Sequence, residues 1–182
     1  SWQEDKGFRL ARSRNRAIAA SCGDYIVLVD GDIIMESHFV EDHLKFARTG
    51  YFIQGTRVLL KREFSREVLA RGAMQPLWWG RGVENRKNCL RSNLLARLFS
   101  FSSTSLTGIK TCNFAFHKHD AIMVNGFNEE FVGWGREDSE FTARLLNRGI
   151  RRQNMKFNGL VFHLFHPMND RTRLQHNHLI LQ

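Results

Sequence analysis

The sequence predicts an α/β fold, and two observations support that prediction. Helical patterns alternate with short apolar runs rich in β-branched residues, which is typical of sheets covered by helices. The 182 residues include 42% hydrophobic and 12% aromatic side chains, enough to bury one sizeable core. We therefore expect residues 1–182 to form a single domain.

The first elements are a helix and a buried strand. Residues 7–23 favour a helix that ends at Gly23. Residues 25–29, YIVLV, are too few for a helix and are rich in β-branched side chains, so they predict a strand buried on both faces.

A second helix and strand follow. Residues 37–50 predict a helix with Ser37 as its N-cap, and residues 51–61 predict a strand that can bend at Gly55. This order favours a sheet of parallel strands, in which ligands bind beyond the carboxyl ends of the strands.

The middle of the chain, residues 64–107, differs from its flanks because arginine and lysine outnumber acidic residues there. We expect helical pieces and a mobile loop. The pair Trp78 and Trp79 is either a core anchor or part of a lid, and we favour the lid.

Three patterns complete the domain. Residues 110–131 predict a strand and then a helix or turn, and residues 133–149 predict a glycine-hinged loop that runs into a helix. Residues 152–167 predict one or two final strands closed by Pro167.

Composition restricts the environment and the partners. The formal net charge of +9 would attract nucleic acid, an anionic membrane surface or a phosphorylated substrate. The three cysteines show no CxxC spacing, so we expect neither a disulfide framework nor a zinc knuckle, and a cytoplasmic location fits best. No apolar run reaches the roughly 20 residues of a membrane span, and no signal peptide precedes the fold.

The strand at 25–29 leads into two aspartates, Asp30 and Asp32, with Gly31 between them. Alternating strand geometry would point both carboxylates to one side, where Mg²⁺ or Mn²⁺ could bind together with substrate phosphates. An Asx turn that caps the next segment is the structural alternative.

The stretch GWGREDSEF, residues 133–141, combines Trp134 with Glu137 and Asp138. Both carboxylates would lie at a helix start, where the helix dipole favours negative charge, and that alone can explain them. Alternatively, Trp134 offers a flat face for a sugar ring, and a neighbouring carboxylate can accept a proton from a hydroxyl.

The stretch VFHLFHP, residues 161–167, carries His163 and His166. In a strand these side chains would face opposite sides, so we expect only one of them to join a metal site with Asp32. A structural hydrogen-bonding role is the commoner one for a lone histidine.

Together, the three motifs resemble nucleotide-diphosphate-sugar glycosyltransferases of the GT-A fold, a Rossmann-like α/β fold. The chain resembles glycosyltransferase family 2, with a C-terminal module similar to that of animal galactosyltransferases and polypeptide N-acetylgalactosaminyltransferases. The resemblance covers residues 7–61 and 108–167. It implies a donor and metal half at 7–61, a basic insert at 64–107, and an acceptor and catalytic half at 108–167.

The resemblance also implies roles for single residues. Asp32 and His163, with His166 as the fallback, would bind Mn²⁺ or Mg²⁺. Asp138 would be the catalytic base.

Contacts to the two substrates follow in the same way. Donor contacts are expected from Asp30, Arg14, Asn15 and Asn113, and acceptor contacts from Glu137 and Trp134.

The implied function is inverting transfer of a hexose or N-acetylhexosamine from a UDP-sugar to a glycan or glycolipid acceptor, in surface polysaccharide or lipooligosaccharide synthesis. The basic residues of 64–107 are either a solvated surface or a face for anionic glycolipid or membrane headgroups, which would give peripheral contact with the inner face of an anionic membrane. The strands that hold the nucleotide base in the family precede the first residues of this sequence, so we expect an N-terminally truncated fold.

Two other functions fit parts of the sequence. A catalytically silent sugar-nucleotide binder would share the site but not the turnover. A nucleic-acid-binding module would use the positive charge, but the acidic pairs at 30/32 and 137/138 would repel phosphates without a metal. We therefore expect no nucleic-acid partner.

Overall fold

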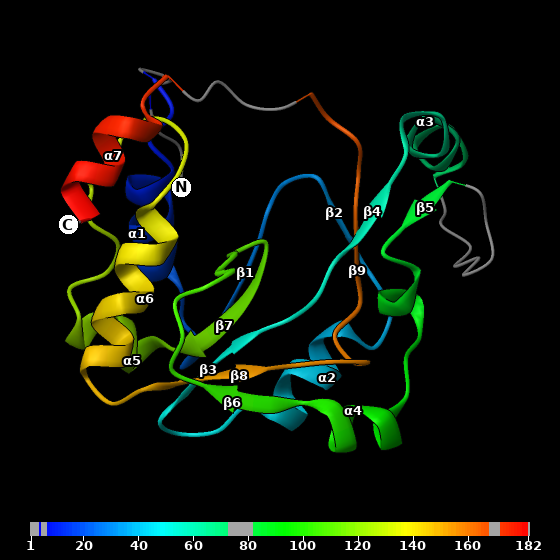
Figure 1. The fold of residues 1–182 in the computed structure, drawn as a ribbon, viewed down its shortest axis with the longest axis horizontal. Helices are drawn as coiled ribbons and strands as arrows, with labels where there is room; N and C mark the ends of the chain where they lie inside the picture. The colour runs from blue at the N-terminus through cyan, green and yellow to red at the C-terminus, as the bar shows by residue number, and fades with distance from the viewer. Residues whose placement is uncertain (1–3, 5–6, 73–81, 168–171, 182) are drawn as a thin grey trace.

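The computed structural model describes residues 4, 7–72, 82–167 and 172–181 (Figure 1). The helices are α1 (Leu10–Ala20), α2 (Phe39–Phe46), α3 (Arg62–Arg71), η1 (Arg86–Cys89), α4 (Asn93–Phe99), α5 (Lys118–Met123), α6 (Glu137–Asn147) and α7 (Leu174–Leu181). The strands are β1 (Tyr25–Val29), β2 (Ile33–Met35), β3 (Tyr51–Gln54), β4 (Val58–Leu60), β5 (Val83–Glu84), β6 (Phe101–Ser103), β7 (Asn113–His117), β8 (Arg151–Asn154) and β9 (Val161–His163). The predicted α/β class is confirmed.

The strands form two sheets. The larger has the order β1-β7-β3-β8-β6 and the smaller the order β2-β9-β4-β5. Among the strands that the structure describes, only β3 with β8 and β4 with β9 pair in parallel. The expectation of parallel strands is therefore wrong for most pairs. The reason is that β1 does not cross over to a parallel neighbour but turns directly into β2 of the other sheet, while β7 pairs with it antiparallel.

The predicted strand over 51–61 is two strands in different sheets. It breaks at Gly55, where an added Cβ would collide with the buried side chain of Asn113. Gly55 also donates its backbone N–H to the Asn113 carbonyl. The expected bend is thus a complete change of sheet.

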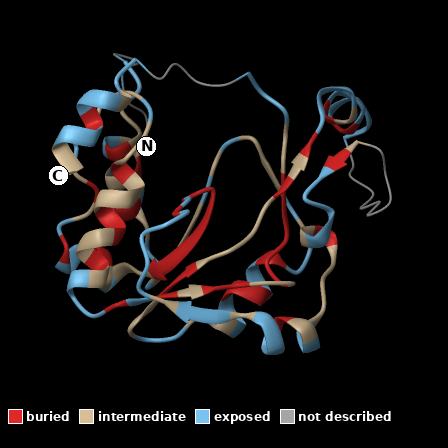
Figure 2. Ribbon diagram, in the orientation of Figure 1, coloured by how far each residue is buried: buried red, intermediate tan, exposed pale blue. Residues whose placement is uncertain are grey.

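The main core lies between the larger sheet and the helices α1, α5 and α6 (Figure 2). Phe114 and Phe116 of β7 contact Phe141 of α6, and Phe127 stacks on the same ring at 4.1 Å between centroids. All four rings are buried. Phe141 and Leu145 therefore anchor α6 to the sheet.

Helix α2 begins two residues later than Ser37. Its N-cap is His38, which makes no capping side-chain bond, and the Ser37 hydroxyl donates to Glu36 instead. The prediction of Ser37 as the N-cap is therefore wrong.

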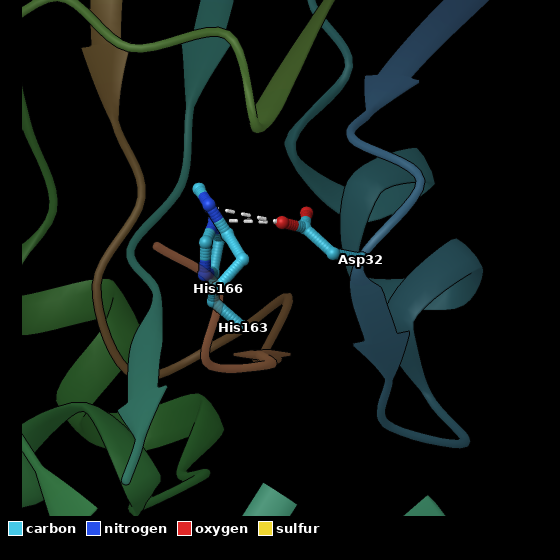
Figure 3. A group of neighbouring side chains, drawn as sticks. All are labelled: Asp32, His163 and His166. Atoms are coloured by element: carbon cyan, nitrogen blue, oxygen red, sulfur yellow. Dashed lines mark ion pairs between the residues drawn. The ribbon is translucent and has the colours of Figure 1, made fainter. Parts of the chain in front are cut away.

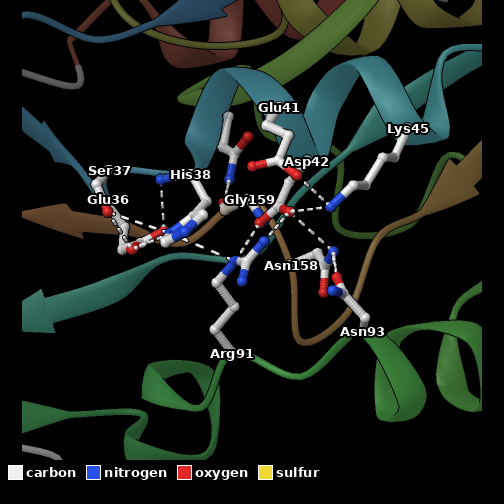
Figure 4. Close-up of polar contacts among 11 residues, drawn as sticks. Glu36, Ser37, His38, Glu41, Asp42, Lys45, Arg91, Asn93, Asn158 and Gly159 are labelled. Atoms are coloured by element: carbon white, nitrogen blue, oxygen red, sulfur yellow. Dashed lines mark hydrogen bonds and ion pairs between the residues drawn. The ribbon is translucent and has the colours of Figure 1, made fainter.

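A buried aspartate fixes α2 to the rest of the molecule (Figure 4). Asp42 is fully buried and accepts two hydrogen bonds from the guanidinium of Arg91, at 2.8 and 2.6 Å. It also accepts from the Asn158 side chain and from the backbone N–H of Gly159. One carboxylate therefore joins α2, the basic insert and the loop between β8 and β9.

The basic middle is built into the fold rather than appended to it. It contributes β5 to the smaller sheet and β6 to the edge of the larger one, where Ser102 pairs with Gln153. Trp78 and Trp79, predicted as a lid, lie outside the described residues. Helix α7 was not predicted. No described helix is long and apolar enough to cross a membrane.

Candidate active site

The cavity at the carboxyl end of β1 collects most of the residues singled out in the sequence. It measures about 1400 Å³ and is lined by Asp30, Asp32, Trp134, Glu137 and Asp138, among others. Strand β1 ends at Val29, so the two aspartates lie in the turn that leads to β2. The turn, not strand alternation, brings both into the cavity.

Asp32 faces two histidines (Figure 3). Its Oδ2 lies 3.5 Å from His163 Nε2 and 3.2 Å from His166 Nε2. One ligand atom from each residue lies within 4.8 Å of the others. The expectation that only one histidine would reach Asp32 is wrong. The reason is that β9 ends at His163, and residues 164–167 are irregular and turn His166 back toward the same carboxylate.

The hydrogen bonds of both histidines use their Nδ1 atoms and leave their Nε2 atoms facing Asp32. His163 Nδ1 lies 3.0 Å from the carbonyl of Leu164, and His166 Nδ1 lies 2.6 Å from the carbonyl of Pro167. Because a carbonyl only accepts, each Nδ1 carries the hydrogen, and a neutral ring then presents a lone pair at Nε2. Two lone pairs and a carboxylate directed at one point suit a divalent metal.

Two further features also suit a divalent metal at Asp32, His163 and His166. Burial is the main cause that lowers the pKa of His163, although the Asp32 charge opposes it, so the ring favours the neutral, ligating form. Asp32 Oδ1 is buried and has no hydrogen-bond partner in the described structure. The imidazole and carboxylate set matches Mn²⁺ chemistry, and more waters would complete the shell for Mg²⁺.

Asp30 belongs to a different cluster. Arg14 of α1 places one guanidinium nitrogen 3.6 Å from Asp30 Oδ1 and another 3.2 Å from Glu137 Oε1. Its side chain is only 9% exposed and also lies over the Phe127 ring. Asp30 therefore has a cationic partner, Arg14, whereas Asp32 faces the two histidines.

Glu137 and Asp138 begin α6, next to Arg14. Burial raises the pKa of both carboxyl groups, and the Asp138 charge raises that of Glu137 further. The backbone N–H of Ser139 and the Arg14 charge act in the opposite direction on Asp138. A buried carboxylate with a raised pKa is a stronger proton acceptor than an exposed aspartate.

The loop before α6 carries Trp134 to the cavity wall. Gly133 and Gly135 have positive φ values of 84° and 102°, which favour glycine, and Trp134 between them is 36% exposed. The predicted glycine-flanked aromatic face is thus present beside the two carboxylates.

Arg57 was missed in the sequence. It lies in the break between β3 and β4 and lines the cavity, and its side chain has one described hydrogen bond, to Cys112 Sγ at 3.5 Å. No acidic side chain within ion-pair distance of it is described. The sequence offered only a weak signal for Arg57, its position two residues after the glycine at which the chain bends.

Asn15 and Asn113 are not brought into the cavity. Asn15 exchanges two hydrogen bonds with the backbone of Phe127. Asn113 is buried and bonds His43, Thr56 and Gly159. The side-chain NH₂ groups of Asn15 and Asn113 already donate to other groups of the protein. Neither side chain therefore has a free donor for a ligand.

Comparison with known families supports the resemblance and extends it along the chain. The model described as "Glycosyl transferase family 2" matches residues 3–110. The chain belongs to glycosyltransferase family 2. A second model, described as "N-terminal domain of galactosyltransferase", matches residues 97–167 and covers the motif around Trp134 and both histidines. No curated protein matches the chain.

Solved structures share the fold of this family 2 member at low sequence identity. One is GalNAc-T7 crystallised with UDP, GalNAc and Mn²⁺, at 10% identity and a TM-score of 0.60, covering 90% of this chain and 32% of that one. Another is the catalytic domain of Drosophila beta1,4galactosyltransferase 7 with xylobiose, at 14% identity and a TM-score of 0.53, covering 98% and 62%. The expected GT-A fold is confirmed, and the chain spans a third to under two thirds of these proteins.

Proposed function

We propose that this chain carries the catalytic site of an inverting, metal-dependent glycosyltransferase that uses a nucleotide-diphosphate sugar. The observation that carries the proposal is the cavity, which is lined by Asp32 and His166 of the candidate metal cluster and also by Trp134, Glu137 and Asp138. Family 2 membership and the fold shared with a UDP- and Mn²⁺-bound enzyme support it.

Asp32, His163 and His166 would hold the divalent cation. When bound, such a cation neutralises the charge on the leaving diphosphate. Arg57 supplies a second positive charge to the same cavity and would contact the diphosphate directly. Asp30 would contact the ribose side of the donor, and Arg14 holds it in place.

Asp138 is the proposed base. It takes the proton of the acceptor hydroxyl as the hydroxyl oxygen bonds to the anomeric carbon and the bond from that carbon to the diphosphate oxygen breaks. One base and attack opposite the leaving group give inversion. Trp134 would lie against the acceptor sugar, and Glu137 would orient the acceptor while bonded to Arg14.

The finer assignment is transfer of a hexose or N-acetylhexosamine from a UDP-sugar to a glycan or glycolipid in surface polysaccharide or lipooligosaccharide synthesis, at the cytoplasmic face of a membrane. Two features favour it: the likeness to enzymes crystallised with UDP and GalNAc or with xylobiose, and the positive charge of the chain.

The test is calorimetric titration of UDP-sugars with and without Mn²⁺, followed by transfer assays, on the full-length protein. We expect Mn²⁺-dependent donor binding that Asp32→Ala abolishes and Asp138→Asn retains, with transfer lost in both variants. Donor binding without turnover in the wild type would instead identify a silent sugar-nucleotide binder. Failure to bind any UDP-sugar would overturn both functions.

A further inference from the structure

Exposed apolar side chains gather along α4 and β6. Leu94 and Leu98 are 68% and 66% exposed, and Phe99 and Phe101 are 57% and 51% exposed. Figure 2 shows this edge of the molecule largely in the colour of exposed residues. Leu94 and Leu98 are four residues apart in α4 and so lie on one face of the helix. Exposed apolar side chains that form one contiguous patch mark interaction surfaces.

A basic pocket adjoins this edge. It measures about 690 Å³, lies between α2 and α4, and is lined by Lys45, Arg48 and Arg97 with no acidic side chain in its lining. Lys45 has an ion pair with Glu41 at 2.5 Å, and the Arg48 guanidinium lies over the Tyr51 ring. All three cationic side chains are exposed, so an incoming anion can reach them.

A second group of cations lies near the start of β6. The backbone N–H of Lys156 bonds to the Ser100 hydroxyl, which places Lys156 at the end of α4. Burial lowers the pKa of Lys156, and the nearby charges of Lys87 and Arg152 lower it further. An anion bound among these cations would reduce the repulsion between them.

We propose that the edge formed by α4 and β6 docks on an anionic lipid surface. The phosphate of a lipid headgroup would enter the basic pocket between Arg97 and Arg48, and Leu94 and Leu98 would enter the boundary between headgroups and acyl chains. Apolar insertion combined with cation attraction is the way in which proteins without a spanning helix bind membranes.

Charge complementarity favours a lipid surface over a second copy of the chain. Two copies meeting at this edge would bring the same cations face to face, whereas an anionic bilayer neutralises them. The pocket shares no lining residue with the cavity that holds Asp32 and Asp138. The surface is therefore separate from the catalytic cavity, and the inference rests on the membrane location in the proposed function while its vesicle test needs no transfer activity.

Vesicle co-sedimentation tests the proposal with the full-length protein. Vesicles of phosphatidylcholine alone are compared with vesicles that also contain phosphatidylglycerol, at low and high salt. We expect binding only to the anionic vesicles, weakened by salt. The triple variant Leu94→Gln, Arg97→Gln and Leu98→Gln should bind at least about tenfold more weakly, because it loses a headgroup contact and both inserted side chains.

The matched control is Ile122→Gln, Met123→Gln and Arg148→Gln. It removes two exposed apolar side chains and one exposed cation at the end of α5 and of α6, away from this edge. Circular dichroism checks that both variants fold. If the triple variant of α4 does not fold, Leu98→Gln alone replaces it.

Equal binding to both kinds of vesicle would overturn the proposal, and so would an equal loss of binding in the control variant. So would a triple variant that binds vesicles normally but no longer self-associates, or a wild type that binds inorganic phosphate but no vesicle.

Discussion

At the scale of single residues, Arg14 explains how acidic groups crowd one cavity. It is buried between Asp30 and Glu137, and its charge lowers the pKa of Asp138 against the effect of burial. Asp32 instead faces the two histidines, which would share a divalent metal with it. The two aspartates that looked like one site in the sequence therefore have different partners.

Replacing Arg14 should shift the pH dependence of transfer. The proposed base acts when it is deprotonated, so the acidic limb of kcat/KM follows the pKa of Asp138. Arg14→Gln removes a charge that lowers this pKa, so the pKa rises and the limb moves to higher pH. Arg12→Gln on the exposed side of the same helix is the control. An acidic limb that stays in place in Arg14→Gln would contradict the assignment of Asp138.

Arg57 should act on the diphosphate and not on the rest of the donor. Arg57→Gln removes one charge-assisted contact, so we expect UDP to bind about tenfold more weakly in the presence of Mn²⁺. Uridine binding should not change, because uridine has no phosphate. Calorimetry measures both, with Arg66→Gln on exposed α3 as the matched control. Equal losses for UDP and uridine would exclude the diphosphate role.

At the scale of elements, the site depends on the points where the chain passes from one sheet to the other. Residues 30–32 join β1 to β2 and carry Asp32, and residues 55–57 join β3 to β4 and carry Arg57. Asn113 joins the second of these connections to the loop between β8 and β9, because its amide donates to the carbonyls of Thr56 and Gly159. Its role in the described structure is thus to hold these two segments together.

The break at Gly55 should not tolerate a side chain. Gly55→Ala places a Cβ against Asn113, which cannot move without losing its hydrogen bonds. We expect the free energy of unfolding to fall by about 1–3 kcal/mol. Denaturant unfolding measures this. Gly23→Ala, where the nearest atom to an added Cβ is at 3.7 Å, should change it little. Equal stability of Gly55→Ala and wild type would show that the contact with Asn113 is not restrictive.

At the scale of the whole molecule, a buried polar network spans both sheets beneath the cavity. His43 of α2 donates from Nε2 to Asn113 Oδ1, and the neighbouring Asp42 holds the loop at Gly159. His43 is 1% exposed, and burial lowers its pKa from 6.5 to about 4. It is therefore neutral in the folded protein at neutral pH.

This network should make the protein less stable in mild acid. The unfolded chain binds a proton at His43 near pH 6.5, whereas the folded protein does so only near pH 4. Between these values the unfolded state binds more protons, so stability falls as pH falls, by up to about 3 kcal/mol in total. Denaturant unfolding at several pH values measures the slope.

A glutamine variant isolates the contribution of this histidine. His43→Gln keeps a donor for Asn113 but does not titrate, so its stability should depend less on pH over the same range. If wild type and variant lose stability in parallel, another group is responsible.

Much of the local structure was predictable because it follows from short-range patterns. The run at 25–29 is a strand because β-branched residues favour one, and α6 forms because Phe141 and Leu145 lie on one helical face. The residues around Asp32 and Asp138 were also predictable as a site, because carboxylates after an apolar strand or beside a glycine-flanked tryptophan need a reason. The prediction that this strand is buried is wrong, because its residues are only partly buried and Val29 is 39% exposed. Local patterns do not contain strand direction or partners, which explains the wrong expectation of parallel strands.

The sequence by itself determined the fold class, the family and the two acidic motifs. Only the tertiary structure decided that both His163 and His166 meet Asp32, that Arg14 serves Asp30 and Glu137, and that Arg57 enters the cavity. Each of these arrangements brings together residues of different elements, such as α1 with the start of α6, or the turn after β1 with the end of β9. Their distances depend on how the sheets pack, because no spacing along the sequence encodes that packing.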